Sequence, residues 1–347
     1  MTTNCSSDRK VGLAIIGMGR AGQIHLKNVI QNWRIRLLWM VDSDRAIAER
    51  LAGEYNLEGV SIATCDEVEN VYNDPRVQAV IVSSPTFTHE AYIRGALAAG
   101  KAVFSEKPIS QDTSGVIQCY DDAKKFGKPL FCSFNRRFDE AFNSIKQQVR
   151  KGVLGDMYMV KTCSRDNPVP SMEYLKISGG IFHDCAVHDI DLICWLLGEY
   201  PTEVYVAAHA HMKDVAAMND VDTVAISLTF PSKVIAIIDL CRMGVYGYHQ
   251  TLEAFGSKGM LTAENQRPTN LQHSTVEGMS MVPIEYSFPQ RHAKGYVKAI
   301  DSFLDVLEGK EDVGGMVATK ESTVNVSRIA EACEESVKTG QAVKIKY

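Results

Sequence analysis

The chain has 347 residues, of which 45% are hydrophobic and 23% are charged, and its formal net charge is -5. This composition is typical of a soluble globular protein, and at about 150 residues per domain the length predicts two domains. The negative net charge and the lack of Lys/Arg runs argue against nucleic acid as a partner. No stretch approaches the roughly 18 consecutive apolar residues of a membrane helix, so no membrane partner is expected.

Nine cysteines are scattered along the chain, and no C-x-x-C spacing occurs. This pattern is typical of buried thiols in a reducing compartment rather than of a disulfide framework or a zinc site. The N-terminal stretch, MTTNCSSDRK, is polar and lacks the apolar region of a signal peptide. We therefore expect a cytoplasmic protein.

Short apolar strands alternate with helices in the N-terminal part of the chain. The predicted strands are 11–17, 35–42, 77–84, 101–106 and 128–134, and the predicted helices are 20–32, 44–56, 88–100 and 112–127. Strand–helix alternation at this spacing predicts an α/β domain with a doubly wound parallel sheet. We assign this domain to residues 1–133.

The pattern changes after residue 135, where strands follow one another without helices between them. A helix at 138–151, a strand at 157–165 and a long apolar helix at 179–198 come first, and predicted strands follow at 203–210, 222–230, 233–242, 249–256 and 259–264. Pro231-Ser232 and Ser257-Lys258 look like hairpin turns, so a large open, mainly antiparallel sheet is expected. Helices at 293–308 and 318–338 and a short last strand complete a second α/β domain, 134–347.

A glycine-rich loop, Gly17-Met18-Gly19-Arg20-Ala21-Gly22, joins the first strand to the first helix as G-x-G-x-x-G. The glycines permit a tight turn, close approach of a pyrophosphate and close helix packing, and the helix N-terminus favours phosphate. Asp42 ends the second strand 20 residues beyond Gly22. An acid there accepts hydrogen bonds from ribose hydroxyls and repels a 2′-phosphate, which predicts NAD. Arg45 keeps NADP open, because an Arg can accept that phosphate.

Glu106-Lys107-Pro108 directly follows a predicted strand of the same domain. Ligands of such sheets bind at the carboxyl ends of the strands. Lys107 there can hydrogen-bond a substrate hydroxyl, although an exposed surface lysine fits the spacing equally well. The bond before Pro108 is a candidate for the cis form.

Asp184 and His188 stand four residues apart in the long apolar helix, so they share one face of an α-helix. A carboxylate beside an imidazole raises the pKa of the imidazole and orients it, which suits a general base. A buried structural His–Asp pair is an equally good interpretation. A metal site that also includes His183, Asp189 and Asp191 is disfavoured, because the last two point away from His188 on the helix.

These three motifs occur together and in this order in the Gfo/Idh/MocA oxidoreductase family, which the chain resembles from about residue 11 to its C-terminus. The matching stretches are AIIGMGRAG, SSPTFTHEAYIRGALAAGKAVFSEKP and GGIFHDCAVHDIDLICWLLG. Within the family the chain looks most like the inositol 2-dehydrogenases. The resemblance implies a Rossmann domain followed by an α/β domain whose open sheet commonly forms an oligomer interface, so a homodimer or homotetramer is expected.

The resemblance also implies roles for individual residues. His188 would be the general base, Asp184 would bind substrate and assist it, and Lys107 would contact the substrate near the reacting carbon. The implied substrate-binding residues are Lys107, Asp166, Asn167, Asp184, His188 and Tyr248. The implied cofactor-binding residues are Gly17, Met18, Gly19, Arg20, Ala21, Gly22, Asp42, Ser84, Thr86, His89, Glu106, Lys107 and Arg136. No metal is expected.

The predicted function is NAD-dependent oxidation of a secondary hydroxyl of a cyclic polyol or sugar, with inositol first, to a ketone. Three alternatives stay open: an NADP-linked dehydrogenase or reductase of dihydrodiols or aldoses, a glycosidase that uses NAD⁺ transiently, and a dinucleotide-binding regulator without catalysis. The presence of Lys107, Asp184 and His188 argues against the regulator, because a non-catalytic relative has no chemical reason to keep all three.

Overall fold

The computed structural model describes residues 10–312 and 314–347, so Cys5 and most of the polar N-terminal stretch lie outside the described residues. The chain divides into two compact units. The first runs to Ser133 and also includes Tyr296–Lys320, and the second consists of Phe134–Gly295 and Glu321–Tyr347. The sequence pattern did not indicate that the segment from Tyr296 to Lys320 belongs with the first unit. In the described ranges, each helix is too short or too polar to cross a bilayer.

The first unit is built on six parallel strands in the order β3-β2-β1-β4-β5-β6. The strands are β1 (Val11–Ile16), β2 (Ile35–Val41), β3 (Ser61–Ala63), β4 (Ala79–Val82), β5 (Ala102–Glu106) and β6 (Leu130–Ser133). The connecting helices are α1 (Arg20–Gln31), α2 (Arg45–Glu54), η1 (Cys65–Glu67), α3 (Glu69–Asn73), α4 (Thr86–Ala98) and α5 (Thr113–Phe126). The predicted doubly wound sheet is confirmed, and its strand order reverses between β1 and β4, where such sheets bind ligands.

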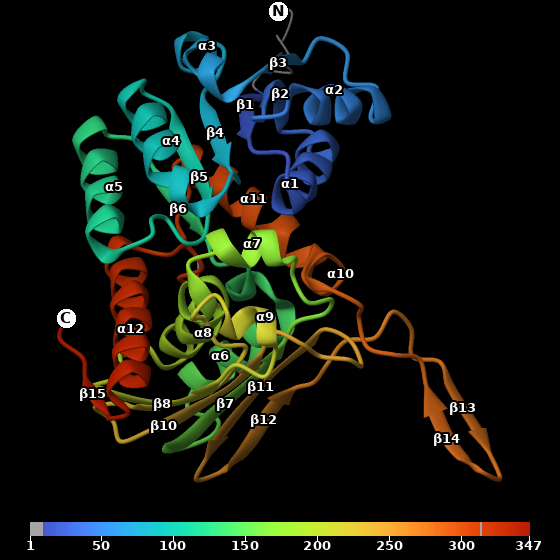
Figure 1. Cartoon of the computed structure of the whole chain (residues 1–347), viewed down its shortest axis with the longest axis vertical. Coiled ribbons are helices and arrows are strands. Elements are labelled where there is room, and N and C mark those ends of the chain that lie inside the picture. The colour runs from blue at the N-terminus through green and yellow to red at the C-terminus, as the bar shows by residue number, and fades with distance from the viewer. Residues whose placement is uncertain (1–9, 313) are drawn as a thin grey trace, which may run out of the picture. The chain divides into compact units, whose positions relative to one another are not determined.

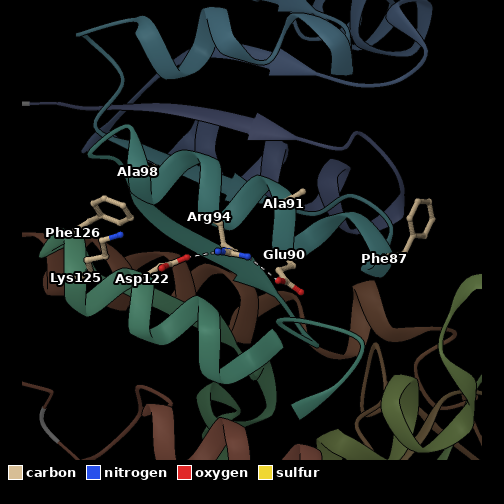
Figure 2. Close-up of a pocket in the computed structure, with 8 residues that line it drawn as sticks. All are labelled: Phe87, Glu90, Ala91, Arg94, Ala98, Asp122, Lys125 and Phe126. Atoms are coloured by element: carbon tan, nitrogen blue, oxygen red, sulfur yellow. Dashed lines mark hydrogen bonds and ion pairs between the residues drawn. The ribbon is translucent and has the colours of Figure 1, made fainter. Parts of the chain in front are cut away.

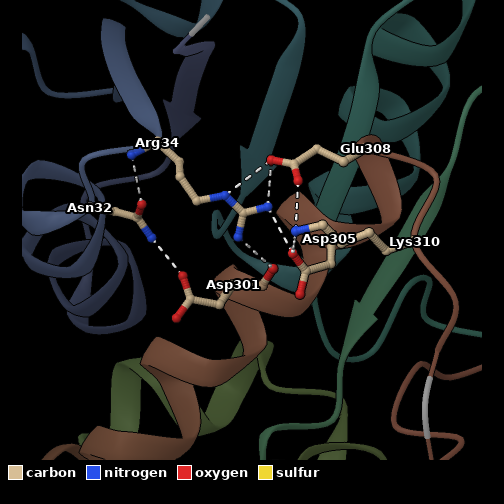
Figure 3. A network of polar contacts seen from close by, with 6 residues as sticks. All are labelled: Asn32, Arg34, Asp301, Asp305, Glu308 and Lys310. Carbon is tan, nitrogen blue, oxygen red and sulfur yellow. Dashed lines mark hydrogen bonds and ion pairs between the residues drawn. The ribbon is translucent and has the colours of Figure 1, made fainter. Parts of the chain in front are cut away.

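Helix α11 (Ala293–Leu307) is tied to the first unit by a polar network around Arg34. The Arg34 guanidinium donates to Asp305 at 2.8 Å and to Glu308 at 2.6 Å. Asn32 donates to the Asp301 carboxylate at 2.8 Å (Figure 3). This network and the stacked aromatic core explain why a segment so late in the sequence joins the first unit. The core rings are Phe104, Phe131 and Phe303.

The second unit contains a seven-stranded sheet in the order β12-β11-β7-β10-β9-β8-β15. Its strands are β7 (Met157–Arg165), β8 (Glu203–His209), β9 (Thr223–Thr229), β10 (Ile235–Cys241), β11 (His249–Gly256), β12 (Gly259–Ala263) and β15 (Val343–Lys344). The predicted hairpins β9–β10 and β11–β12 are confirmed. β10 and β11 are not neighbours, because β7 lies between them and runs parallel to β10.

Helices cover one face of this sheet and leave the other open (Figure 1). The helical segments are η2 (Asn135–Phe138), α6 (Glu140–Arg150), α7 (Met172–Ile177), η3 (Phe182–Ala186), α8 (Val187–Leu197), α9 (Lys213–Ala216), α10 (Phe288–Arg291) and α12 (Lys320–Thr339). On the open face, Tyr205, Ile235 and Phe255 are exposed. A fully exposed hairpin, β13 (Gln272–Thr275) and β14 (Gly278–Met281), extends away from the sheet.

Candidate active site

The glycine loop of the first unit has the geometry that a dinucleotide requires. Gly17 has φ +94°, and a Cβ there would lie 2.5 Å from the backbone nitrogen of Ser84. A Cβ on Gly22 would lie 1.9 Å from the carbonyl oxygen of Gly17, whereas a Cβ on Gly19 would meet nothing within 4 Å. The open space at Gly19 leaves its backbone accessible to a pyrophosphate. No side chain caps the N-terminus of α1, so its N–H groups can bind phosphate.

Asp42 is fixed beside this loop at the end of β2. One carboxylate oxygen accepts from the backbone N–H of Met18 at 2.6 Å, and the other accepts from that of Asp44 at 3.0 Å. Arg20 and Ala21 form the first turn of α1. The carboxylate is half-buried and keeps lone pairs for ribose hydroxyls, so the residues present fit a bound dinucleotide.

His89 connects the loop after β4 to the turn after β5. It is buried, and its ring nitrogens lie 2.8 Å from the Ser84 carbonyl oxygen and 2.7 Å from the Pro108 carbonyl oxygen. Burial lowers the pKa of His89. The Ser84 hydroxyl bonds to that of Thr88 at 2.7 Å, and Thr86 begins α4. His89 is therefore placed to hold two loops in position.

Glu106 ends β5 in a buried pair with His25 of α1, the two side chains lying 2.7 Å apart. Burial is the largest single effect and acts to raise the pKa of Glu106, but the hydrogen bonds from His25 and Ser133 and the nearby charges of His25 and Lys107 together outweigh it, so the pKa is lowered. The next residue, Lys107, is half-buried and precedes a cis bond to Pro108. Sequence reasoning missed His25, since nothing in the local pattern of α1 indicates its partner 81 residues away.

Asp184 lies on a π-helical turn rather than on a continuous α-helix. The turn η3 (Phe182–Ala186) precedes α8, and the N–H of Val187 bonds to the carbonyl of Phe182, an i→i+5 pattern. The predicted buried helix over 179–198 is present, but it contains this π turn, so the α-helical angle assumed between Asp184 and His188 does not hold across the junction. Such π turns are rare and frequent at functional sites.

Two residues from other segments donate hydrogen bonds to the Asp184 carboxylate. Tyr174 donates to one oxygen at 2.7 Å, and Arg242 donates to the other at 3.0 Å. Arg242 is fully buried and also contacts Asp220 at 3.5 Å. Sequence reasoning missed Tyr174, Arg242 and Asp220, because no short motif includes them. The two donors fix the orientation of the carboxylate, whose oxygens can also accept from a substrate hydroxyl.

His188 begins the second turn of the helical run, on α8, and is half-buried. Its ring packs edge-on against Phe134, with ring centroids 6.5 Å apart. The contact with Phe134 restricts the orientation of this half-buried imidazole, which suits a general base.

Asp189 and Asp191 bind arginines. Asp189 pairs with Arg136 at 2.7 Å and Asp191 with Arg137 at 2.6 Å, and all four side chains are buried. Neither acid is directed toward a shared ligand with His188, and the described ranges contain no group of three or more metal-binding side chains. The charge of Arg136, predicted to border the nicotinamide, is thus balanced within the second unit.

Asp166 lies near Asp184. The thiol of Cys185, the residue after Asp184, contacts the Asp166 carboxyl at 3.5 Å. Burial and the nearby Asp184 raise the pKa of Asp166. Tyr248 is buried in the same neighbourhood, and burial raises the pKa of its hydroxyl. Asn167 donates to the carbonyl of Tyr286 at 2.8 Å. The second unit thus brings Asp166, Asp184 and Tyr248 together, while the Asn167 amide N–H is engaged elsewhere.

A separate hollow of about 510 Å³ lies between α4 and α5 of the first unit (Figure 2). Its ion pairs run from Arg94 to Glu90 at 3.3 Å and to Asp122 at 2.7 Å. Phe87 and Phe126 line its two ends. None of the predicted site residues lines this hollow, so we do not assign it to the chemistry.

Two family models match the chain. One, described as an oxidoreductase family with an NAD-binding Rossmann fold, matches residues 11–134, and the other, a GFO/IDH/MocA C-terminal domain, matches residues 142–262. With the glycine loop and Asp42, they define the protein as an NAD-binding oxidoreductase.

Similar proteins cover nearly the whole chain. It is 35% identical over 333 residues to the inositol 2-dehydrogenase of Rhizobium meliloti (strain 1021), a match that covers 94% of this chain and 99% of that protein. It is 34% identical over 300 residues to the myo-inositol 2-dehydrogenase of Thermotoga maritima, covering 86% and 89%. The crystal structure of scyllo-inositol dehydrogenase from Lactobacillus casei with bound NAD(H) and scyllo-inositol matches at a TM-score of 0.87 and 26% identity, covering 96% and 99%. The chain therefore belongs to the Gfo/Idh/MocA oxidoreductase family, as its three motifs predict.

Proposed function

We propose that this protein uses NAD⁺ to oxidise one secondary hydroxyl of an inositol to a ketone. The observation that carries the proposal is the near-complete match to myo- and scyllo-inositol dehydrogenases, one of them with NAD(H) and a cyclic polyol bound. The space over Gly19 and the placement of Asp42 support the cofactor.

The chemistry follows from the residues of this chain. Bound NAD⁺ supplies the hydride acceptor. His188 removes the proton from the reacting hydroxyl, and in the reverse direction the protonated imidazole returns it. Asp184, held by Tyr174 and Arg242, accepts a hydrogen bond from a neighbouring hydroxyl, and Lys107 donates to a substrate oxygen. Holding several oxygens at once fixes the reacting carbon, which lowers the entropic part of the barrier.

The remaining predicted residues would define the edges of the sites. Asp166, Asn167 and Tyr248 would contact further hydroxyls of the polyol. Ser84, Thr86 and Arg136 would border the cofactor, and the buried His89 and Glu106 would hold the adjoining loops, since their side chains are already bound within the first unit.

The direct test is formation of reduced coenzyme from inositol isomers, pentoses, hexoses and dihydrodiols with NAD⁺ and with NADP⁺. We expect the highest kcat/KM with an inositol and NAD⁺. A preference for NADP⁺ with a dihydrodiol or an aldose would favour the reductase alternative. Binding of a dinucleotide without turnover of any polyol would favour the regulator.

His188→Ala in the same assay should lower kcat by about 10²-fold or more, because the proton acceptor is removed, while NAD⁺ affinity stays near that of the parent. His183→Gln is a matched control on the neighbouring turn, where the ring contacts Glu334 at 3.5 Å, and should keep most of the parent kcat. An alanine variant at position 188 with activity close to the parent's would reject the assignment.

We also infer a homodimer or homotetramer in the cytoplasm. The uncovered face of the seven-stranded sheet carries exposed Tyr205, Ile235 and Phe255, and exposed apolar side chains on an open sheet favour association. All cysteines in the described ranges are free thiols, which fits a reducing compartment. Sedimentation of the purified protein as a monomer would contradict the proposed assembly.

A further inference from the structure

Arg45 stands close to the acid that is expected to bind the adenosine ribose. It begins α2, three residues after Asp42, with Asp44 as the N-terminal cap of the helix. An arginine in this region is the residue type that accepts the 2′-phosphate of NADP. Whether it does so depends on where its guanidinium is held.

The Arg45 guanidinium is directed to β3 and to the short helix η1 that follows it. One nitrogen donates to the carboxylate of Glu67 at 2.5 Å, and another donates to the carbonyl of Ile62 at 3.2 Å. These two acceptors engage both terminal nitrogens and so fix the direction of the guanidinium.

Glu67 is held in place by Thr64, independently of Arg45. The backbone N–H and the hydroxyl of Thr64 both donate to the same Glu67 oxygen, at 2.8 and 2.9 Å. The two residues form a capping box at the start of η1, in which the Thr64 N–H donates to the Glu67 carboxylate and the Thr64 side chain accepts from the Glu67 N–H. Exposed ion pairs usually contribute little because both side chains must be ordered. Here only the arginine has to be ordered. The hydrogen bonds from Thr64 also lower the pKa of Glu67, so it stays ionised.

The surroundings of Arg45 are acidic. Asp42, Asp44 and Asp66 lie on the adjoining turns, and Thr64 lowers the pKa of Asp66. With Glu67, this part of the chain carries four carboxylates and Arg45, whose charge is paired with Glu67. A dianionic 2′-phosphate would meet net negative charge, while uncharged ribose hydroxyls find acceptors.

We propose that Glu67 determines coenzyme specificity by holding Arg45 away from the ribose 2′-position. The inference rests on the proposed function, since it requires that the glycine loop binds a dinucleotide. Glu67 is a positioning residue: it acts through Arg45, and its removal would make the arginine available to NADP.

The test measures dissociation constants of NAD⁺ and NADP⁺ without substrate, by calorimetric titration of the full-length protein. Glu67→Gln keeps an oxygen for Thr64 but loses the charge that holds Arg45. We expect the affinity for NADP⁺ relative to NAD⁺ to rise on the order of 3- to 10-fold. The double variant Glu67→Gln/Arg45→Gln should lose most of this gain, because the phosphate partner is gone.

Glu69→Gln is the matched control, because it removes the same charge from an exposed position on α3, where the structure gives Glu69 no ion pair among the described residues. It should change the ratio much less than Glu67→Gln. An equal gain from Glu69→Gln, an unchanged ratio in Glu67→Gln, or a gain that survives loss of Arg45 would each overturn the inference. A parent protein that binds neither dinucleotide would instead refute the proposed function.

Discussion

Two carboxylates of the candidate sites are positioned by partners that no short motif contains. The sequence motifs point to Asp184 and Glu106, but the groups that hold them come from far away in the chain: Arg242 for Asp184 and His25 for Glu106. A motif records the residue types in one segment, and it carries no information on which distant side chain satisfies a buried charge. Burial makes those partners necessary, because an isolated buried carboxylate is strongly disfavoured.

Asp166 offers a test of this electrostatic account through pH. Its pKa is raised in the folded chain by burial and by Asp184, so the folded state binds a proton more readily than the unfolded state. Stability therefore falls as pH rises above the ordinary value of 3.8. We expect Asp166→Asn to raise the thermal unfolding midpoint at neutral pH, and the gain to shrink as pH is lowered toward that value.

The exposed Asp214 of α9 provides the control for this experiment. Asp214→Asn should leave the midpoint nearly unchanged at every pH. If Asp166→Asn lowers the midpoint by a constant amount across the pH range, the carboxyl is stabilising in its charged form and the account of Asp166 is wrong.

At the scale of elements, helices and strands with a strong hydrophobic pattern could be predicted from the sequence, and those with a weak pattern could not. The strands β1, β2, β4, β5 and β6 and the hairpins of the second unit follow the predicted ranges closely. Several short segments were missed, among them β3 with three residues and α9 and α10 with four each. So few residues cannot display a period. The π turn at Phe182–Ala186 was not predicted for another reason. In a stretch that is apolar on most sides, one extra residue in a turn does not change the hydrophobic pattern of the sequence.

The attachment of α11 gives a prediction at this scale. Arg34→Met removes the guanidinium that binds Asp305 and Glu308. Amide hydrogen exchange in α11 should then become about fivefold faster, equivalent to ~1 kcal/mol. The effect is modest because the two acidic partners are partly exposed. Arg36→Met is the control, since Arg36 is exposed near the start of β2, two residues after Arg34, and has no ion pair among the described residues. Equal exchange rates in the two variants would show that the network does not hold α11.

At the scale of the whole molecule, the sequence predicted the fold class well, but it did not predict the full order of the strands or which unit each segment joins. The doubly wound sheet and the mainly antiparallel second sheet were both predicted, but β7 lies between β10 and β11, and the segment from Tyr296 to Lys320 returns to the first unit. Both features depend on long-range pairing, which local patterns do not encode. The substrate class comes from the similar proteins, because selectivity among polyols depends on hydrogen-bond geometry around each hydroxyl.

The central claim is direct hydride transfer from a carbon of inositol to NAD⁺. The most direct measurement uses myo-inositol and scyllo-inositol that carry deuterium on the reacting carbon, followed by mass analysis of the reduced coenzyme. The account predicts one deuterium in each NADH for every ketone formed. Ketone formation with NADH that contains no deuterium, or a product that keeps its deuterium, would contradict it.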